Sequence, residues 1–169
     1  DKPVKHIYRI KAQELDPDVP ASSYNLARLE LDRGNVDRSV EILRELRQEE
    51  PDNLIILETL AYARHQQGSE EDAMEIYRSI LQEDQGRVTT LYNLSVLVKD
   101  AQEAIELLKR ANRLAPEDQE VLQRLVSILS AEERPEEAVV YLERLRRLVL
   151  EDREALEADQ RAQNDPGDE

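Results

Sequence analysis

Few side chains in this sequence have the types and spacing that catalysis or metal binding requires. The 169 residues include two histidines, His6 and His65, and no cysteine. A nucleophile–base pair or a zinc site would therefore depend on His65 together with partners from distant parts of the chain. The sequence has no glycine-rich phosphate loop, no HExxH motif and no acidic loop with calcium spacing. We therefore predict that the protein is not an enzyme and holds no metal or cofactor.

Acidic residues dominate the charge of the chain. Asp and Glu number 38 against 23 Lys and Arg, which gives a net charge of −15. We expect most of these carboxylates to be solvated or paired with arginines one helical turn away. A charge of this sign opposes binding to a phosphate backbone, so nucleic acid is not an expected partner.

Hydropathy and cysteine usage constrain the location only in part. No apolar run approaches the roughly 20 residues needed to span a bilayer, so we expect a soluble protein without membrane insertion. A chain without cysteine suits the cytoplasm and an oxidising compartment such as the periplasm equally well. The first residue is Asp1 and not methionine, which favours excision or processing of a longer chain. The compartment therefore stays open.

A repeat organises the rest of the sequence. "LARLELDRG" at residues 26–34 and "LAYARHQQG" at residues 60–68 each open on Leu-Ala and close on Gly, 34 residues apart. The register continues through two further segments, the third unit being three residues shorter at its inner turn. We divide the chain into four units, which are residues 20–53, 54–87, 88–118 and 119–150.

Each unit has the pattern of two amphipathic helices. Apolar residues recur at helical spacing in the first helix, as at Leu26 and Leu29. Gly34 and Gly68 predict left-handed turns that end this helix, and Glu133 occupies the same place in the fourth unit. Asn35 and Ser69 follow the glycines, where the next helix needs an N-cap. One hairpin cannot cover both of its apolar faces, so neighbouring hairpins must stack.

This pattern resembles the tetratricopeptide repeat over roughly residues 4–150. The resemblance implies an all-α solenoid of about four helical hairpins. It also implies an N-terminal half-repeat helix within residues 1–19 and a C-terminal capping helix at residues 151–163. We expect residues 1–163 to form a single superhelical domain, followed by a disordered acidic tail at residues 164–169.

Ligand-binding positions follow from the same resemblance, because the first helices of such repeats line a concave groove. Tyrosine side chains offer large, stiff contact areas, and asparagine amides can pair with a bound backbone. Packing between helices is the competing role for the Tyr-Asn pairs. The predicted peptide-binding residues are Tyr24, Asn25, Arg28, Ile55, Glu58, Tyr62, His65, Tyr92, Asn93 and Val96.

The family's clamp for C-terminal carboxylates is not expected here. Asn93 and Arg124 match two of its positions, but Glu58 and Glu120 stand where the clamp has lysines. Two carboxylates would repel an acidic chain end. The partner is therefore predicted to be a neutral or basic protein segment and not an acidic chaperone tail.

The predicted function is a protein–protein interaction module that binds a peptide segment or helix in its concave groove. Two alternatives stay open. The N-terminal half repeat, with Ile7 and Ile10, could stack on another chain and produce a homo-oligomer. The chain could also be a regulatory segment of a larger enzyme.

Overall fold

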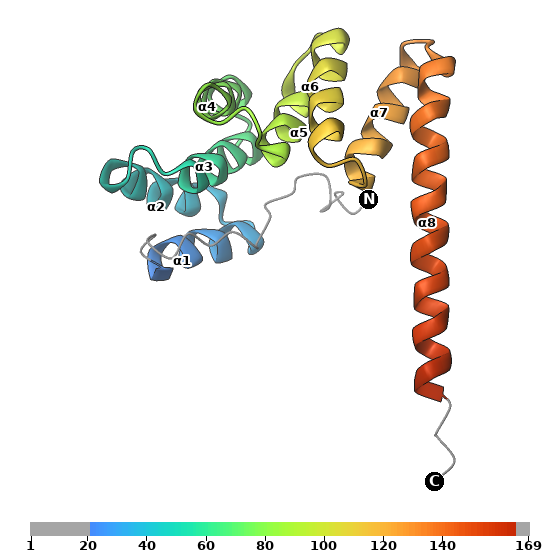
Figure 1. Ribbon diagram of the computed structural model, residues 1–169. Coiled ribbons are helices and arrows are strands. Elements are labelled where there is room, and N and C mark those ends of the chain that lie inside the picture. The colour runs from blue at the N-terminus through green and yellow to red at the C-terminus, as the bar shows by residue number, and fades with distance from the viewer. Residues whose placement is uncertain (1–20, 165–169) are drawn as a thin grey trace. The chain divides into compact units, whose positions relative to one another are not determined.

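The computed structural model describes residues 21–164, and within them all regular secondary structure is α-helical (Figure 1). This confirms the all-α fold class. The eight helices in this range are α1 (Ala21–Asp32), α2 (Val36–Glu49), α3 (Leu54–Gln66), α4 (Glu70–Glu83), α5 (Val88–Leu97), α6 (Ala101–Leu114), α7 (Gln119–Ala131) and α8 (Pro135–Asn164).

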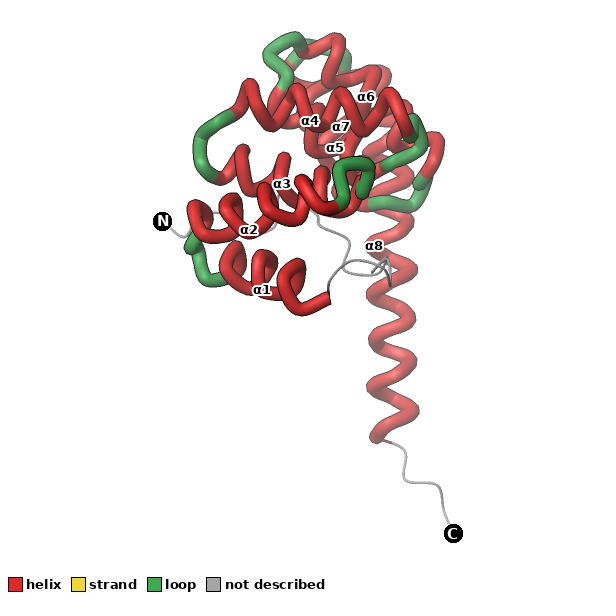
Figure 2. The backbone as a smooth tube through the Cα atoms, turned by 90° about the vertical axis from the view of Figure 1, so that its left-hand side faces the viewer, coloured by secondary structure: helices red, strands yellow, loops and turns green. Residues whose placement is uncertain are grey.

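Consecutive helices pair as hairpins, which Figure 2 shows as helices joined by short loops. The packed pairs are α1 with α2, α3 with α4, α5 with α6, and α7 with α8. Helices α3, α5 and α7 begin at residues 54, 88 and 119, where the sequence places the starts of repeats. None of the helices within residues 21–164 combines the length and the apolar character needed to cross a membrane.

Two compact units make up the chain, Asp1–Leu114 and Ala115–Glu169. The described part of the first unit contains α1 to α6, where α2 packs on α3 and α4 packs on α5, so its three hairpins are stacked. The described part of the second unit is the α7–α8 hairpin. A single domain over residues 1–163 stays a prediction.

The inner turns confirm the expected role of the repeated glycines. Gly34 and Gly68 have φ angles of 82° and 86°, in the left-handed region that glycine adopts without strain. Glu133 takes the same kind of turn with φ 55°. The shortened third unit closes its turn with residues 98–100 between α5 and α6.

Helix capping differs from the sequence-based expectation. The side chains of Asn35 and Ser69 form no cap hydrogen bond. Asn53 and Asp118 do cap, since their side chains accept hydrogen bonds from the first backbone amides of α3 and α7. Asp100 likewise accepts a hydrogen bond from the Glu103 amide in the first turn of α6, so side-chain capping occurs before the first helices α3 and α7 and before the second helix α6.

The core of each hairpin is built from leucine, isoleucine and alanine at the repeated positions. Small residues such as Ala27 and Ser39 are fully buried where paired helices approach closely. Leu26 and Leu29, which follow the apolar spacing of the first helix, are nevertheless each 42% exposed. They lie on α1, the first described helix, and the described helices α2 and α3 pack elsewhere on it.

The last helix is continuous, whereas the sequence predicted a separate C-terminal capping helix. Residues 151–163 are helical, but they continue α8 without a break and do not form a separate cap. No glycine or proline interrupts the sequence after Pro135 until Pro166, so nothing ends the helix earlier. Residues 1–19, with the predicted half-repeat helix, lie outside the described range. Asn164 belongs to α8, and the remaining predicted tail, residues 165–169, is also outside that range.

Candidate protein-binding site

The first helices of the first unit are linked to one another by polar side chains. The Tyr24 hydroxyl on α1 lies 2.9 Å from the Thr59 hydroxyl on α3. Thr59 donates its single hydrogen to the Ile55 carbonyl at 2.9 Å, so Tyr24 acts as the donor between the two helices. The bond joins the first repeat to the second.

A second link joins α3 to α5 through Glu58. The Thr90 hydroxyl donates to one carboxylate oxygen of Glu58, and the Arg87 guanidinium donates to the other at 3.0 Å. Glu58 is buried, and a buried carboxylate requires such partners. Glu58, predicted to bind a peptide in the groove, is therefore not open to a ligand, because both of its oxygens are engaged within the protein.

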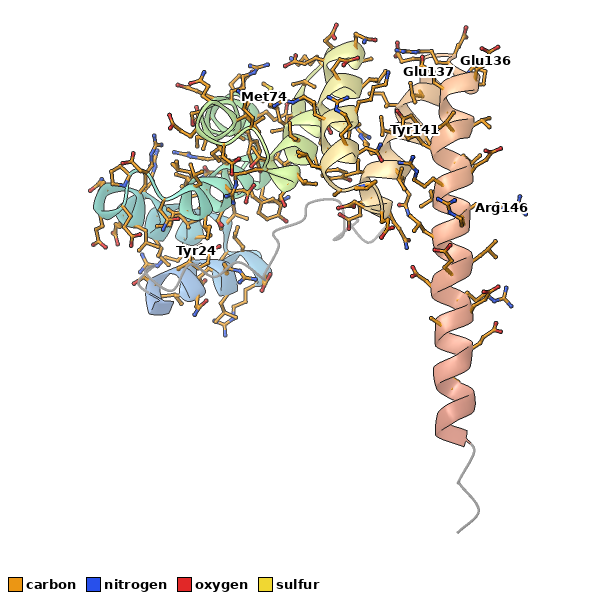
Figure 3. The ribbon with its side chains drawn as sticks, viewed as in Figure 1. Tyr24, Met74, Glu136, Glu137, Tyr141 and Arg146 are labelled. Atoms are coloured by element: carbon orange, nitrogen blue, oxygen red, sulfur yellow. The ribbon has the colours of Figure 1, made fainter. Side chains whose placement is uncertain are left out.

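Two of the three tyrosines predicted to bind a peptide, which are Tyr24, Tyr62 and Tyr92, are inaccessible. Tyr24 and Tyr92 are only 2% and 7% exposed, so the expectation that they line an open groove is wrong. In Figure 3, Tyr24 lies between α1 and the neighbouring helices. Packing between helices, the competing role for these residues, uses both rings. Tyr62 differs because it is half-buried.

The accessible remainder of the predicted set forms what we call the first-helix patch. Its residues follow helical spacing on α1, α3 and α5 and are either half-buried or, for Asn25, exposed. Among the described residues, none pairs with Arg28. Burial lowers the pKa of His65 below its ordinary value, and the nearby Glu70 carboxylate opposes this effect. The patch comprises Asn25, Arg28, Ile55, Tyr62, His65 and Val96.

Asn93 on α5 has an unusual environment beside this patch. Its side chain is 1% exposed, and neither its amide nitrogen nor its amide oxygen has a hydrogen-bond partner. A buried polar group left unpaired costs about 1–3 kcal/mol, so the amide has an unmet requirement for a donor and an acceptor. The equivalent positions in the first two repeats hold Asn25, which is exposed, and Thr59, which is bonded to Tyr24.

Sequence reasoning missed a cavity of about 330 Å³ on other helices of the first unit. Arg44 and Arg47 of α2 line one side of it, Asp72 and Glu75 of α4 line another, and Arg64 of α3 contributes as well. The spacing of Arg44 and Arg47 was a signal that they share a face of α2. Opposite charges on its walls leave the cavity without a clear ligand preference.

The described residues contain no group of three His, Cys, Asp or Glu side chains arranged to hold a metal ion. Tyr24 and Glu58 each form a hydrogen bond with the next first helix, to Thr59 and Thr90 respectively, so both side chains are used within the fold. What the geometry offers is therefore a contact surface with hydrogen-bonding capacity.

Comparison with known proteins agrees with the helical hairpins. Two family models described as tetratricopeptide repeat match residues 12–88 and 96–161. No curated protein matches the sequence.

Several solved structures share the fold. A crystal structure of MamA superposes with a TM-score of 0.72 at 15% identity, covering 82% of this chain and 83% of that chain. MamA from Desulfovibrio magneticus RS-1, from residue 41 to its end, gives 0.70 at 14% identity and covers 78% and 76%. TTC0263, a thermophilic TPR protein of Thermus thermophilus, gives 0.64 at 16% identity and covers 75% and 73%. At these identities the likeness concerns the fold alone.

Proposed function

This chain belongs to the tetratricopeptide-repeat family and is a scaffold for protein–protein interaction, and we propose that it binds an extended segment of a partner protein on the first-helix patch. Ile55, Tyr62 and Val96 would supply the apolar contact, since each still has surface to lose to a ligand. Tyr62 is the aromatic anchor in this proposal, because a tyrosine ring buries a large area at low cost in conformational entropy.

The single observation that carries the proposal is the unpaired amide of Asn93. A peptide backbone presents an N–H group and a C=O group, which are the donor and the acceptor that the Asn93 oxygen and nitrogen lack. Because Asn93 is enclosed, a neighbouring side chain must move before a ligand reaches it. Binding would then remove the free-energy cost of the unpaired Asn93 amide in the free protein, and this would add to the free energy gained from the apolar contact.

The net charge of −15 favours a neutral or basic segment as the ligand. Glu58 contributes nothing to this preference, since Arg87 neutralises it within the fold. Arg28 is the local exception, because its guanidinium would donate hydrogen bonds to one carboxylate or backbone carbonyl of the ligand.

A matched pair of asparagine variants tests the proposal. Peptides selected from a random displayed library against the wild-type chain supply the probe, and fluorescence anisotropy gives their dissociation constants. We expect Asn93→Leu to weaken binding at least about tenfold, because it removes both hydrogen-bonding groups. Asn112→Leu on α6, also at a nearly buried position but on a second helix, should leave binding unchanged.

Stability measurements separate a binding role of Asn93 from a purely structural one. Replacing an unpaired amide by an apolar side chain of similar size should leave the chain as stable or make it more stable. Equal peptide affinity for wild type and Asn93→Leu would remove Asn93 from the site. A library that yields no ligand at all would contradict the proposed function itself.

The two alternative functions receive no support from the described residues. The self-assembly proposal depends on Ile7 and Ile10, which lie outside residues 21–164. A regulatory role within a larger enzyme corresponds to no particular feature of the described helices.

A further inference from the structure

Exposed apolar side chains are concentrated on α8 in the second unit. Of the eight large hydrophobic residues reported as exposed among the described residues, five belong to this helix. They are between 46% and 58% exposed, and they are Val139, Val140, Leu142, Val149 and Leu150. An apolar surface of this kind, bordered by charged residues, is typical of an interaction site.

Four of these residues share one face of α8 with Arg146. The spacing of Val139, Leu142, Arg146, Val149 and Leu150 places them within a sector of about 100° on the helix, which we call the α8 stripe. Tyr141 points toward α7, and Arg146 projects from the opposite side of α8 (Figure 3). Packing with α7 therefore leaves the α8 stripe uncovered within the second unit.

Helix α8 is longer than its partner, with 30 residues against 13 in α7, so its C-terminal part extends past α7. Gln119, at the first turn of α7, still bonds Asp152 of α8 at 2.5 Å. The stripe runs along this shared stretch, but on a side of α8 that α7 does not reach.

The charges around the stripe have a defined polarity. Arg146, Leu150 and Glu154 are four residues apart and form a single row along the helix. Neither Arg146 nor Glu154 has an ion-pair or hydrogen-bond partner in the part of the chain that the structure describes. Nearby charges do pair within α8, as Arg153 does with Glu157 at 2.9 Å. The row therefore consists of a positive group at Arg146, an apolar centre at Leu150 and a negative group at Glu154, and neither charge is paired among the described residues.

We propose that α8 pairs antiparallel with α8 of a second copy of this chain, about a two-fold axis that passes close to Leu150. The two Leu150 side chains then meet at the axis, and Arg146 of each copy lies opposite Glu154 of the other. A parallel pairing would place like charges together, which disfavours it. Glu143 comes nearest to Glu157 of the second copy, whose charge Arg153 already balances.

Such an interface is small, because it consists of one helix face on each side. Interfaces below about 1,200 Å² are typical of weak, transient association. The expected behaviour is a concentration-dependent equilibrium between monomer and dimer. Salt acts on it in two directions, because it screens the repulsion between two chains of net charge −15 and also the two Arg146–Glu154 pairs.

Sedimentation equilibrium of the full chain over a range of concentrations and salt tests the pairing. The average mass should rise from the monomer value of 19.6 kDa toward twice that value. We expect Leu150→Glu to hold the mass at the monomer value. Val140→Glu is the matched control, because Val140 is exposed on α8 but lies outside the stripe, and it should associate like wild type.

Charge reversal tests the antiparallel geometry. Arg146→Glu and Glu154→Arg should each weaken the dimer about tenfold, because each places two like-charged pairs across the axis. The variant with both reversals should recover wild-type association to within about threefold. Far-UV circular dichroism checks that every variant keeps its helix content.

Three results would overturn the inference. The first is a wild-type mass that stays at the monomer value at every concentration. The second is a Leu150→Glu variant that associates as well as Val140→Glu does. The third is a double reversal that associates no better than the single reversals. None of these results bears on peptide binding by the first-helix patch, which belongs to the other unit.

Discussion

The first helices of the first unit and helix α8 of the second unit use their polar side chains in opposite ways. In the first unit, Tyr24 bonds Thr59 across two repeats, and Glu58 is held by Thr90 and Arg87. In the second unit, the α8 stripe exposes apolar side chains and includes an arginine without a partner among the described residues. The same repeat pattern therefore yields internal links in one unit and available surface in the other.

The difference follows from which side of a helix has a neighbouring repeat. Tyr24 and Glu58 lie where the next first helix packs, so their hydrogen bonds are formed within the protein. α8 is the last described helix, and the apolar residues of its stripe are exposed. Residues on helices of one repeat type thus cannot be assigned to ligand binding until their neighbours are known.

Among single substitutions in the first unit, Arg87→Met should cause the greatest loss of stability. The variant leaves the buried Glu58 carboxylate with only Thr90 as a partner. We expect a loss of about 2 kcal/mol in the free energy of unfolding, below the 3–5 typical of fully buried pairs because Arg87 retains some exposure. Urea denaturation followed by circular dichroism measures this loss.

Arg78→Met is the matched control. Its partner Glu103 also lies 3.0 Å away, but both side chains are well exposed, so the cost should stay below about 1 kcal/mol. A double variant, Glu58→Met with Arg87→Met, should be more stable than Arg87→Met alone, because no carboxylate is left buried without its cation. Equal losses for Arg87→Met and Arg78→Met would mean that the inner link contributes no more than a surface pair.

The second prediction concerns the hydroxyl of Tyr24. Tyr24→Phe removes the donor to Thr59 and leaves the buried ring in place, so we expect a loss of about 1 kcal/mol in the free energy of unfolding. Peptide affinity should not change, whereas Tyr62→Ala should weaken it. A Tyr24→Phe variant that keeps full stability but loses peptide affinity would reverse the assignment of these two tyrosines.

The periodicity of the sequence was sufficient to predict where several helices begin and how two of their turns are formed. The recurrence of Leu-Ala and Gly predicted where α3, α5 and α7 begin, and it predicted the left-handed turns at Gly34 and Gly68. These features are local, since they depend on apolar spacing and on backbone freedom at one position. The tetratricopeptide-repeat family followed from the same residues.

The candidate site was predictable only as a set of helix faces. Tyr24, Glu58 and Tyr92 are on the expected faces, but spacing within one helix does not reveal which side chain the next repeat will cover. Links such as Glu58 with Thr90 join residues 32 positions apart and depend on how the helices pack. The continuity of α8 could have been predicted from the sequence. No glycine or proline lies near residues 150 and 151, where the predicted capping helix was separated from the helix before it.

The third prediction compares the turns of the two units. Glu133 adopts φ 55°, which disfavours any residue with a β-carbon, while Gly34 occupies the equivalent turn of the first repeat. Glu133→Gly should stabilise the second unit by about 0.5 kcal/mol, since relief of backbone strain exceeds the entropy that glycine adds to the unfolded chain. Gly34→Ala should destabilise the first unit by about 1 kcal/mol through backbone strain alone, as its added β-carbon meets no atom within 4 Å. Thermal unfolding of both variants measures the direction of each change in stability. Two changes in the same direction would contradict the argument from backbone strain.

The smallest expected effect is the pH dependence contributed by His65 of the first-helix patch. Burial lowers the pKa of His65 in the folded chain below its ordinary value of 6.5, so the unfolded chain binds this proton more readily. The stabilisation is present above the unfolded pKa and is lost as the pH falls through the lower folded pKa. Wild type should therefore lose more stability between pH 7.5 and pH 5.5 than His65→Gln does. The difference between the two chains isolates His65 from the carboxylates, which both chains share. An identical loss of stability in wild type and His65→Gln would contradict this prediction. It would mean that burial does not lower the pKa of His65, and that water reaches this part of the first-helix patch more freely than the half-buried position on α3 indicates.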